Sequence, residues 1–380
     1  MSRLWGKIAD YVRETDKVLF LLCITASLYG AAMVLSATRY TGSPRAFLVQ
    51  LGALAVGVAA AVAISSLLDY NTIVKWWPVA AGIALVLVGL TFFIGYAPAG
   101  TDDKAWIKLP FGMSFQPSEL LKIAFIITFA KHVSVLEDRV NAPLNLLALC
   151  LHGAIPVLLI HLQGDDGTAL VLAIIFLAMM FAAGVRLRYF AIAGVLAAVA
   201  APIVWLVVLN EDQRSRFTIL FNPELDLYGT GWQQWRARVA MANGGFFGKG
   251  YLRGDFVQNN RVPEGHNDFM FASIGEELGM LGLITVVLLL MAIGVRLLLI
   301  AHRAKDKQGV ILCAGLFGML GAQMILNIGM CVSLLPVIGI TLPFFSAGGT
   351  SLVSTFLGMG LALNVYMHRD RRLMYLRDEV

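Results

Sequence analysis

The stretch VLFLLCITASLYGAAMVLSA, residues 18–37, contains twenty residues and no charged side chain. Because about 20 apolar residues in a helix cross the hydrocarbon core of a bilayer, this stretch predicts a transmembrane helix. Nine further stretches meet the same need, some of them marginally, and the stretch 117–134 is interrupted by Glu119, Lys122 and Lys131. They are residues 47–67, 75–95, 117–134, 144–162, 167–185, 189–209, 269–301, 310–332 and 349–367. The sequence therefore predicts an all-α integral membrane protein with about ten transmembrane helices in one polytopic domain, residues 1–380.

The overall composition agrees with this prediction. Of the 380 residues, 58% are hydrophobic and 14% are charged, whereas a soluble domain carries about 25% charged residues. The first 17 residues mix acids and bases and lead into a full-length span, so we expect an uncleaved anchor rather than a cleaved signal peptide. The four cysteines lie in or at the ends of apolar runs without paired spacing, which favours packing over a disulfide or a metal site.

Basic residues gather on one predicted side of the membrane. Both terminal segments and the loops that share their side carry Arg3, Lys7, Arg13, Lys17, Lys75, Lys131, Arg139, Arg186, Arg188, Arg296, Arg303, Lys305, Lys307, Arg369, Arg371, Arg372 and Arg377. The short loops on the opposite side carry only Arg39, Arg45, Lys104 and Lys108. By the positive-inside rule, both termini are predicted to be cytoplasmic. The net charge of +5 reflects this topology and does not indicate nucleic-acid binding.

Residues 210–268 form a predicted long extracytoplasmic loop between spans seven and eight. A loop of this length is usually functional or disordered, and its many aromatic residues argue against disorder. Within it, residues 230–243 have helical character. This segment is either an amphipathic helix on the membrane surface or an ordinary packing helix, and both interpretations stay open.

Two polar motifs lie at predicted ends of spans. Glu119 and Lys122 are three residues apart, so they share one helix face. They form either a structural ion pair or a charged wall of a substrate cavity in which Lys122 is available to a phosphate. The motif QGDDGT, residues 163–168, places two adjacent acids at a membrane boundary, where they either bind a cation or order a tight turn.

Three further segments carry unusual chemistry. The glycine-rich stretch 244–250, GGFFGKG, resembles a phosphate cradle superficially but lacks the P-loop spacing and its Ser/Thr, so a flexible loop is the alternative. In PEGHNDF, residues 263–269, Asp268 stands where a polar loop enters the membrane. Reduced dielectric there raises a carboxylate pKa toward the range of a general base, although Asn267 or Asp268 also suits a helix N-cap. Residues 335–351, rich in proline and glycine, predict an irregular segment at membrane depth that is either buried in protein or lines a cavity.

Taken together, these motifs resemble the SEDS family (shape, elongation, division, sporulation), the bacterial cell-wall polymerases that include RodA and FtsW. The matching segments are Trp106-Ile107 followed by FQPSELLK at 115–122, QGDDGTA at 163–169, NPELD at 222–226, GGFFGKG at 244–250, PEGHNDFMFA at 263–272, EELG at 276–279, NIGM at 327–330 and LPVIGITLPFFSAGGTS at 335–351. The form of GGFFGKG favours the RodA branch over the FtsW branch.

The chain also departs from the family pattern. Gly164 and Asp166 stand where the family usually reads Q-P-D-L-G-T, so Asp165 matches the motif's acid and Asp166 is an addition without an assigned role. Ala347 replaces a frequent tyrosine, and Asn267 replaces a common threonine.

The resemblance implies a peptidoglycan glycosyltransferase that polymerises lipid II by inverting transfer, with release of undecaprenyl pyrophosphate. It implies that Asp268 is catalytic. The predicted substrate-binding residues are Glu119, Lys122, Trp106, Gln116, Asp165, Lys249, Glu264 and His266. No cofactor is assigned; a divalent cation, Mg or Mn, is one option for the pyrophosphate, and its ligands are unknown.

The resemblance further implies a multi-pass protein of the bacterial cytoplasmic membrane and a class B penicillin-binding protein, a transpeptidase, as partner. Two alternatives remain: a lipid II flippase and a non-enzymatic cell-wall scaffold. A flippase needs a polar path to the cytoplasmic side. The ionisable residues of this chain gather instead at the non-cytoplasmic ends of its predicted spans.

Overall fold

The computed structural model describes residues 13–97, 103–110, 114–209, 211–221, 226 and 229–369. Its long helices are α2 (Lys17–Ala37), α3 (Arg45–Leu67), α5 (Trp77–Ile94), α6 (Pro117–Leu136), α7 (Pro143–His161), α8 (Asp166–Ala182), α9 (Leu187–Ile203), α13 (Met270–His302), α14 (Lys307–Cys331) and α15 (Gly349–Met367). The shorter helical elements are η1 (Arg39–Thr41), α4 (Tyr70–Lys75), η3 (Glu137–Asn141), η4 (Val204–Val208), α10 (Glu211–Phe221), α11 (Thr230–Gly244) and α12 (Asp255–Gln258). Strands β1 (Ile107–Lys108) and β2 (Ser114–Phe115) pair antiparallel.

The long helices coincide with the predicted spans, to within a few residues at each end. Among the described residues, eight of them are long and apolar enough to cross a membrane. The other two predicted spans fall short of that standard: α8 has 17 residues, and α6 contains Glu119, Lys122 and Lys131. The protein is thus an all-α, multi-pass membrane protein, and the count of ten spans stays a prediction.

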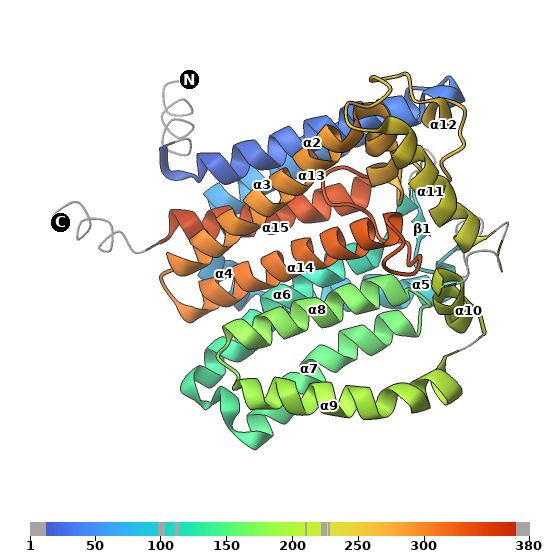
Figure 1. Cartoon of the computed structure of the whole chain (residues 1–380). Helices are drawn as coiled ribbons and strands as arrows, with labels where there is room; N and C mark the ends of the chain where they lie inside the picture. The colour runs from blue at the N-terminus through green and yellow to red at the C-terminus, as the bar shows by residue number, and fades with distance from the viewer. Residues whose placement is uncertain are drawn as a thin grey trace.

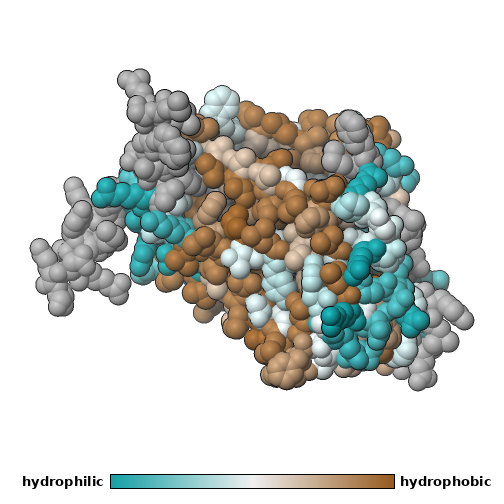
Figure 2. Space-filling view, turned by 90° about the horizontal axis from the view of Figure 1, so that it is seen from above, coloured by the Kyte–Doolittle hydropathy of each residue, from teal (hydrophilic) through white to brown (hydrophobic). Residues whose placement is uncertain are grey.

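The helices lie side by side, and α10, α11, α12 and β1 gather at one end of the bundle (Figure 1). The surface seen in Figure 2 is hydrophobic across the middle and hydrophilic at the two ends. This distribution is typical of a bundle whose middle faces hydrocarbon and whose ends face water. We call the end that carries α11 and α12 the polar end.

The core lies around α14 and α15. Helix α14 packs against α6, α8 and α13, while α15 packs against α3. Small residues permit close helix contacts: a Cβ atom at Gly360 of α15 would lie 2.7 Å from the Cα atom of Ala61 in α3. In contrast, α9 has no buried residue, as expected for a helix that faces lipid on all sides.

The long loop 210–268 contains α10, α11 and α12 in its described part. Helix α11 packs against α13 and buries Gly231, Gln234, Ala237, Ala240 and Gly244, which recur at helical spacing. Gln234 Nε2 donates to the backbone oxygens of Met330 (3.0 Å) and Leu335 (2.7 Å). These contacts support the packing interpretation of the segment predicted at 230–243. The NPELD motif lies mostly outside the described residues.

Candidate active site

Asp268 lies at the polar end, in the turn that leads into α13. The N-cap position of α13 is Phe269, without a side-chain cap. The predicted capping role of Asn267 or Asp268 is therefore wrong, because the helix begins one residue later than that role requires. Asn267 Nδ2 instead donates to Glu264 Oε2 at 2.8 Å. The carboxylate of Asp268 accepts no hydrogen bond from the part of the chain that the structure describes.

The surroundings of Asp268 favour its protonated form. Burial raises the pKa of Asp268 to about 7, and the negative charges of Glu264 and Asp165 act in the same direction. A carboxylate that is about half ionised near neutral pH suits general-base catalysis. The site thus has the property that the sequence predicted for it.

The backbone of Asp268 is fixed from α14. Asn327, which is fully buried, donates its Nδ2 protons to the backbone oxygens of Asp268 (2.8 Å) and Ile340 (2.6 Å). Cys331 Sγ lies 3.7 Å from the same Asp268 oxygen. The NIGM motif was part of the resemblance, but sequence reasoning assigned no role to its asparagine. The available signal was an amide side chain inside an apolar span.

Residues 333–348 are irregular and pass beside Asp268, whereas the last three residues of the predicted irregular segment 335–351 already belong to α15. Ser346 Oγ donates to the backbone oxygen of Asn267 at 2.6 Å, and the Ala347 amide donates to that of His266 at 2.8 Å. Gln50 Nε2 of α3 donates to the Ser346 backbone oxygen at 3.1 Å. The turn that carries Asp268 is therefore held by contacts from distant parts of the chain.

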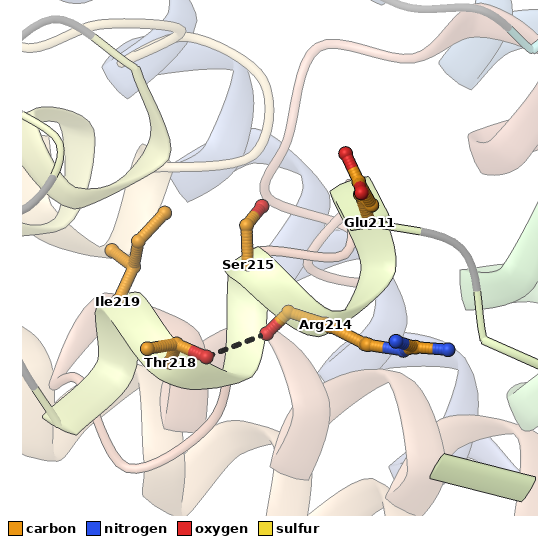
Figure 3. A pocket seen from close by; sticks show the side chains of 5 residues that line it. All are labelled: Glu211, Arg214, Ser215, Thr218 and Ile219. Carbon is orange, nitrogen blue, oxygen red and sulfur yellow. Dashed lines mark hydrogen bonds between the residues drawn. The ribbon is translucent and has the colours of Figure 1, made fainter. Parts of the chain in front are cut away.

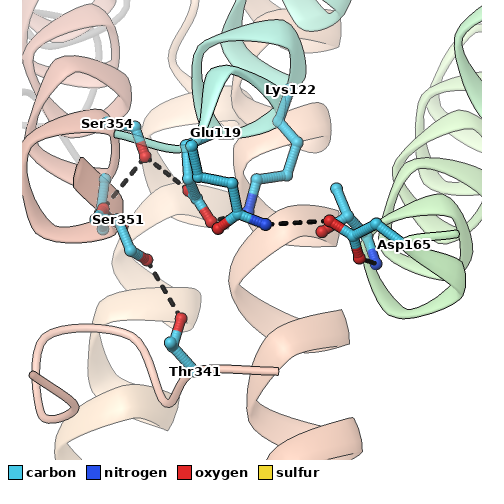
Figure 4. Close-up of polar contacts among 9 residues, drawn as sticks. Glu119, Lys122, Asp165, Thr341, Ser351 and Ser354 are labelled. Carbon is cyan, nitrogen blue, oxygen red and sulfur yellow. Dashed lines mark hydrogen bonds and ion pairs between the residues drawn. The ribbon is translucent and has the colours of Figure 1, made fainter. Parts of the chain in front are cut away.

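Glu119 and Lys122 form the predicted ion pair, with 2.9 Å between Lys122 Nζ and Glu119 Oε1. Ser354 of α15 donates to Glu119 Oε2 at 2.8 Å. Figure 4 shows the pair between α15 and Asp165, with Thr341 hydrogen-bonded to Ser351 on the neighbouring segment. The pair is therefore buried inside the protein, between α15 and the turn that carries Asp165, and does not face lipid.

Asp165 lies next to this pair. Its Oδ2 accepts from Gln116 Nε2 at 2.9 Å, and its Oδ1 accepts from the Thr168 amide at 2.9 Å, which makes it the N-cap of α8. Burial raises the pKa of Asp165, while its bonds to Thr168, the charge of Lys122 and the bond to Gln116 act in the opposite direction. The charge of Asp165 also acts on Asp268, so the two carboxylates influence each other electrostatically.

Asp166, the addition to the family motif, lies outside this cluster. It pairs with His161 Nδ1 at the end of α7 and accepts a hydrogen bond from Gln213 of α10. It therefore ties α7, α8 and the first helix of the long loop together. No contact links it with Asp268 among the described residues.

The remaining predicted binding residues are distributed unevenly. Glu264 and His266 adjoin Asp268 in one turn, and burial lowers the pKa of His266 while the charge of Glu264 opposes that shift. Trp106 belongs to a small hairpin, where its backbone oxygen accepts from the Tyr96 amide at 2.9 Å. Lys249 is exposed, and within the described chain its ammonium has no hydrogen bond or ion pair. The binding roles of Trp106 and Lys249 stay predictions.

The glycine-rich stretch 244–250 docks on α13. The amides of Lys249 and Gly250 donate to the backbone oxygens of Glu276 and Glu277, each at 2.9 Å. A Cβ atom at Gly244 would lie 1.9 Å from the Gly275 oxygen, so only glycine permits this approach. Since those two amides are occupied, they are not available to a phosphate. The stretch is a packing element at the break in α13.

Glu276 and Glu277 are fully buried in α13 and hold the loop above it. Glu276 accepts from the amides of Phe256 and Val257, both at 2.8 Å, at the start of α12. Glu277 accepts from Ser36 Oγ at 2.6 Å. These two acids are thus engaged in anchoring the loop.

A hollow lies along α10, and Figure 3 shows its lining. The residues that line it all come from that one helix: Glu211, Arg214, Ser215, Thr218 and Ile219. It contains none of the predicted site residues, so we do not assign the active site there. The described part of the chain also holds no group of three or more His, Cys, Asp or Glu side chains placed to bind a metal ion.

Comparisons with known proteins place this chain in a family. The model of the FtsW/RodA/SpoVE family, described as cell cycle proteins, matches residues 16–371. The chain is 32% identical over 364 residues to a probable peptidoglycan glycosyltransferase FtsW of Geobacter sulfurreducens, covering 93% of this chain and 95% of the relative. It is 31% identical over 370 residues to the peptidoglycan glycosyltransferase MrdB of Escherichia coli K12, covering 96% and 95%.

Solved structures give the same result. A chain from a peptidoglycan synthase complex, studied for its coordination of polymerization and crosslinking, superposes with a TM-score of 0.80 at 26% identity, covering 94% of this chain and 99% of the other. The rod shape determining protein RodA of Thermus thermophilus superposes with a TM-score of 0.69 at 25% identity, covering 94% and 98%. Relatives from both branches match, so the RodA preference stays a prediction. By its sequence and its fold, the chain belongs to the FtsW/RodA/SpoVE family, which is the SEDS family that its motifs resemble.

Proposed function

We propose that this chain is a peptidoglycan glycosyltransferase that polymerises lipid II into glycan strands. The observation that carries the proposal is Asp268: a part-buried carboxylate without a hydrogen bond from the described residues, whose pKa lies at about 7. It stands in the PEGHNDF motif, in the same site as the Glu119–Lys122 pair and Asp165. Relatives over nearly the whole chain are named peptidoglycan glycosyltransferases, which supports the reaction class.

The reaction is a direct displacement. The sugar 4-hydroxyl of an incoming lipid II transfers its proton to the Asp268 carboxylate as its oxygen bonds to the anomeric carbon of the lipid-linked strand. The bond between that carbon and the pyrophosphate oxygen breaks, and undecaprenyl pyrophosphate leaves with the electron pair. One displacement inverts an α-linked donor into a β-linked product, so no glycosyl-enzyme intermediate is required.

The leaving pyrophosphate needs positive charge as the bond breaks. Lys122 is a buried cation beside this cluster: Glu119 fixes its ammonium at 2.9 Å, and its charge acts on Asp165. An ammonium has three protons, and among the described residues only Glu119 accepts one of them. We therefore assign Lys122 to the pyrophosphate, with Gln116 holding Asp165, and Glu264 and His266 bordering the acceptor.

Asp165 and Asp268 are the acids that this cluster offers to a divalent cation, and Asp165 already accepts two hydrogen bonds. With no third protein ligand among the described residues, we derive no step through a metal. As partner we propose a class B penicillin-binding protein, a transpeptidase that cross-links the new strands. One solved relative belongs to a complex that couples polymerization with crosslinking. The proposed location is the bacterial cytoplasmic membrane, with both termini cytoplasmic.

The test is polymerisation of purified lipid II by the purified protein, with and without the partner, and with EDTA, Mg²⁺ or Mn²⁺. Glycan chains longer than lipid II on a gel, and their loss in Asp268→Asn, support the proposal. Transport of lipid II across vesicles without any polymer, under conditions that include the partner, would contradict it.

A further inference from the structure

Two adjacent phenylalanines project from the polar end. Phe246 is 56% exposed and Phe247 is 77% exposed, and their ring centroids lie 5.0 Å apart in an edge-to-face arrangement. They belong to the segment 245–251, which we call the Phe loop. Pairs of large apolar side chains in the open are uncommon on soluble surfaces and mark a contact with lipid or protein.

The exposure of these rings is built into the backbone. The amide of Met280 donates to the Gly245 oxygen at 2.9 Å, and that of Leu281 donates to the Phe246 oxygen at 3.3 Å. A Cβ atom at Gly248 would lie 2.1 Å from the Glu277 oxygen, so the loop lies directly against α13. The Phe loop is therefore held rigidly, with its two rings pointing away from the protein.

These hydrogen bonds also fix the position of the Phe loop along α13, next to Met280 and Leu281. This helix has 33 residues and is broken at Gly279, where φ is 66°. Residues 270–277, which lie between the break and the N-terminal end of α13, are all buried. On the C-terminal side of the break, the residues on the outer face are exposed: Met280 (50%), Leu281 (44%), Ile284 (44%) and Leu288 (60%).

Helix length then locates the bilayer. Residues 280–302 rise about 35 Å, which already spans a hydrocarbon core of about 30 Å. We infer that the apolar surface that faces lipid begins near Met280, and that the N-terminal part of α13, before Gly279, lies outside the hydrocarbon. Since the Phe loop is hydrogen-bonded to the amides of Met280 and Leu281, Phe246 and Phe247 continue that lipid-facing surface at its boundary toward the polar end.

We propose that the Phe loop inserts Phe246 and Phe247 into the leaflet on the side of the candidate active site, at the boundary between headgroups and acyl chains. Aromatic rings favour this depth. Lys249, exposed two residues further on, is placed to meet lipid phosphates, which include those of a lipid-linked substrate. The inserted loop fixes how deeply α13 sits in the bilayer. Because the first turn of α13 follows Asp268, the loop also fixes the distance of the Asp268 carboxylate from the hydrocarbon core. The insertion itself does not depend on the proposed reaction.

Whether Phe246 and Phe247 contact lipid, protein or water can be measured with a fluorescent probe that is sensitive to depth in the bilayer. Phe247→Cys is made together with Cys150→Ser, because Cys150 is the exposed one of the native cysteines and the other three are buried. The thiol is labelled with the fluorophore NBD, and the protein is placed in vesicles of phosphatidylethanolamine and phosphatidylglycerol. Some vesicles contain lipids with a spin label near the top of the acyl chain. The matched control carries the label at Arg261→Cys, an exposed position of the same loop region.

We expect blue-shifted NBD emission at position 247, strong quenching by the spin-labelled lipid and little quenching by aqueous iodide. The control at position 261 should show the reverse. Adding Phe246→Ser to the labelled protein should weaken the lipid quenching, because half of the apolar anchor is lost. Iodide quenching at position 247 equal to that of the control would overturn the proposal. Shielding from iodide that appears only after a transpeptidase is added would also overturn it, because it would identify a protein as the occupant.

Discussion

Lys122 Nζ lies 2.9 Å from Glu119 Oε1, and the two side chains are only 2% and 6% exposed. The pair is thus a buried ion pair within one helix, at the end of α6 that reaches the candidate active site. Removal of one partner leaves the other charge buried and uncompensated, which typically costs about 3–5 kcal/mol. Replacement of both partners by neutral side chains of similar size removes that penalty.

Glu119→Gln and Lys122→Met should therefore each lower the unfolding temperature in detergent, and the double variant should lose less than either single variant. All three should polymerise lipid II poorly, because Lys122 or its positioning is lost. Ser354→Ala is the control: it removes one hydrogen bond to Glu119 without unpairing a charge, and it should cost only about 1 kcal/mol. Single variants with the unfolding temperature and the polymer yield of the unchanged protein would refute both roles of the pair.

A second prediction concerns Asn327. Asn327→Leu has nearly the same size but leaves the backbone oxygens of Asp268 and Ile340 without their donor, at a cost of about 1–3 kcal/mol for each. We expect a lower unfolding temperature and a loss of polymerisation that exceeds the loss of folded protein. Neighbouring Met324→Leu, on the same helix, is the control for a change of shape without a lost hydrogen bond. If Asn327→Leu behaves like that control, Asn327 does not position the catalytic turn.

The pH dependence of the reaction follows from Asp268. Its pKa is raised from 3.8 to about 7 by burial, by Glu264 and by Asp165. A general base acts when ionised, so the rate of polymerisation should rise with pH and level off above about 7. Stability has the opposite sign: the folded state binds this proton more tightly, so the contribution of Asp268 is complete below pH 4 and is lost as pH rises through 7. A rate that does not change between pH 5.5 and 8, in a protein that stays folded, would exclude Asp268 as the base.

The predicted topology can be tested with introduced cysteines. Lys104→Cys and Asp255→Cys lie in exposed positions of the two loops that we place outside the cytoplasm, and both are made with Cys150→Ser. A membrane-impermeant thiol reagent should label both in intact spheroplasts. Lys305→Cys, between α13 and α14, should react only after lysis. Labelling of position 305 in intact spheroplasts, with none at 104 and 255, would invert the orientation.

The spans were predictable because each must be apolar over its own length to lie in lipid, a property that can be read locally. The Glu119–Lys122 pair was predictable for a similar reason, since a spacing of three residues places both on one helix face. Long-range contacts were not predictable. Asn327 reaches Asp268 across 59 positions, and Ser354 reaches Glu119 across 235. These contacts depend on how the helices pack, which no local pattern specifies.

The glycine-rich stretch shows a second limit of local patterns. GGFFGKG suggested a phosphate cradle because such cradles also use closely spaced glycines. The glycines instead allow the backbone to lie against α13 at its break, where a Cβ atom at Gly248 would lie 2.1 Å from the Glu277 oxygen. A glycine that permits contact with a ligand and one that permits contact with a helix look the same in sequence.

The last prediction concerns Asp268→Asn. Asparagine keeps the shape of the side chain but cannot accept the proton of the sugar hydroxyl, and loss of general-base catalysis typically costs about 10²–10⁴-fold in rate. Since the side chain of Asp268 caps no helix, the variant should fold, bind lipid II and recruit its partner. It should be at least as stable as the unchanged protein at pH 8, because a carboxylate with a raised pKa is then no longer buried in its ionised form.

Two measurements separate this role from the others that an aspartate can have at this position. If Asp268 is a metal ligand, high Mg²⁺ or Mn²⁺ should partly restore polymerisation by Asp268→Asn, whereas a lost base is not restored by cation. If Asp268 supports only the fold, the variant should lose stability and activity together. Asp166→Asn provides the matched control, since it also neutralises an acid near the start of a span but has its partners outside the site. It should polymerise at a rate close to that of the unchanged protein. An Asp268→Asn protein that does the same would end the catalytic assignment, because the reaction would then proceed without the carboxylate that we propose as the base.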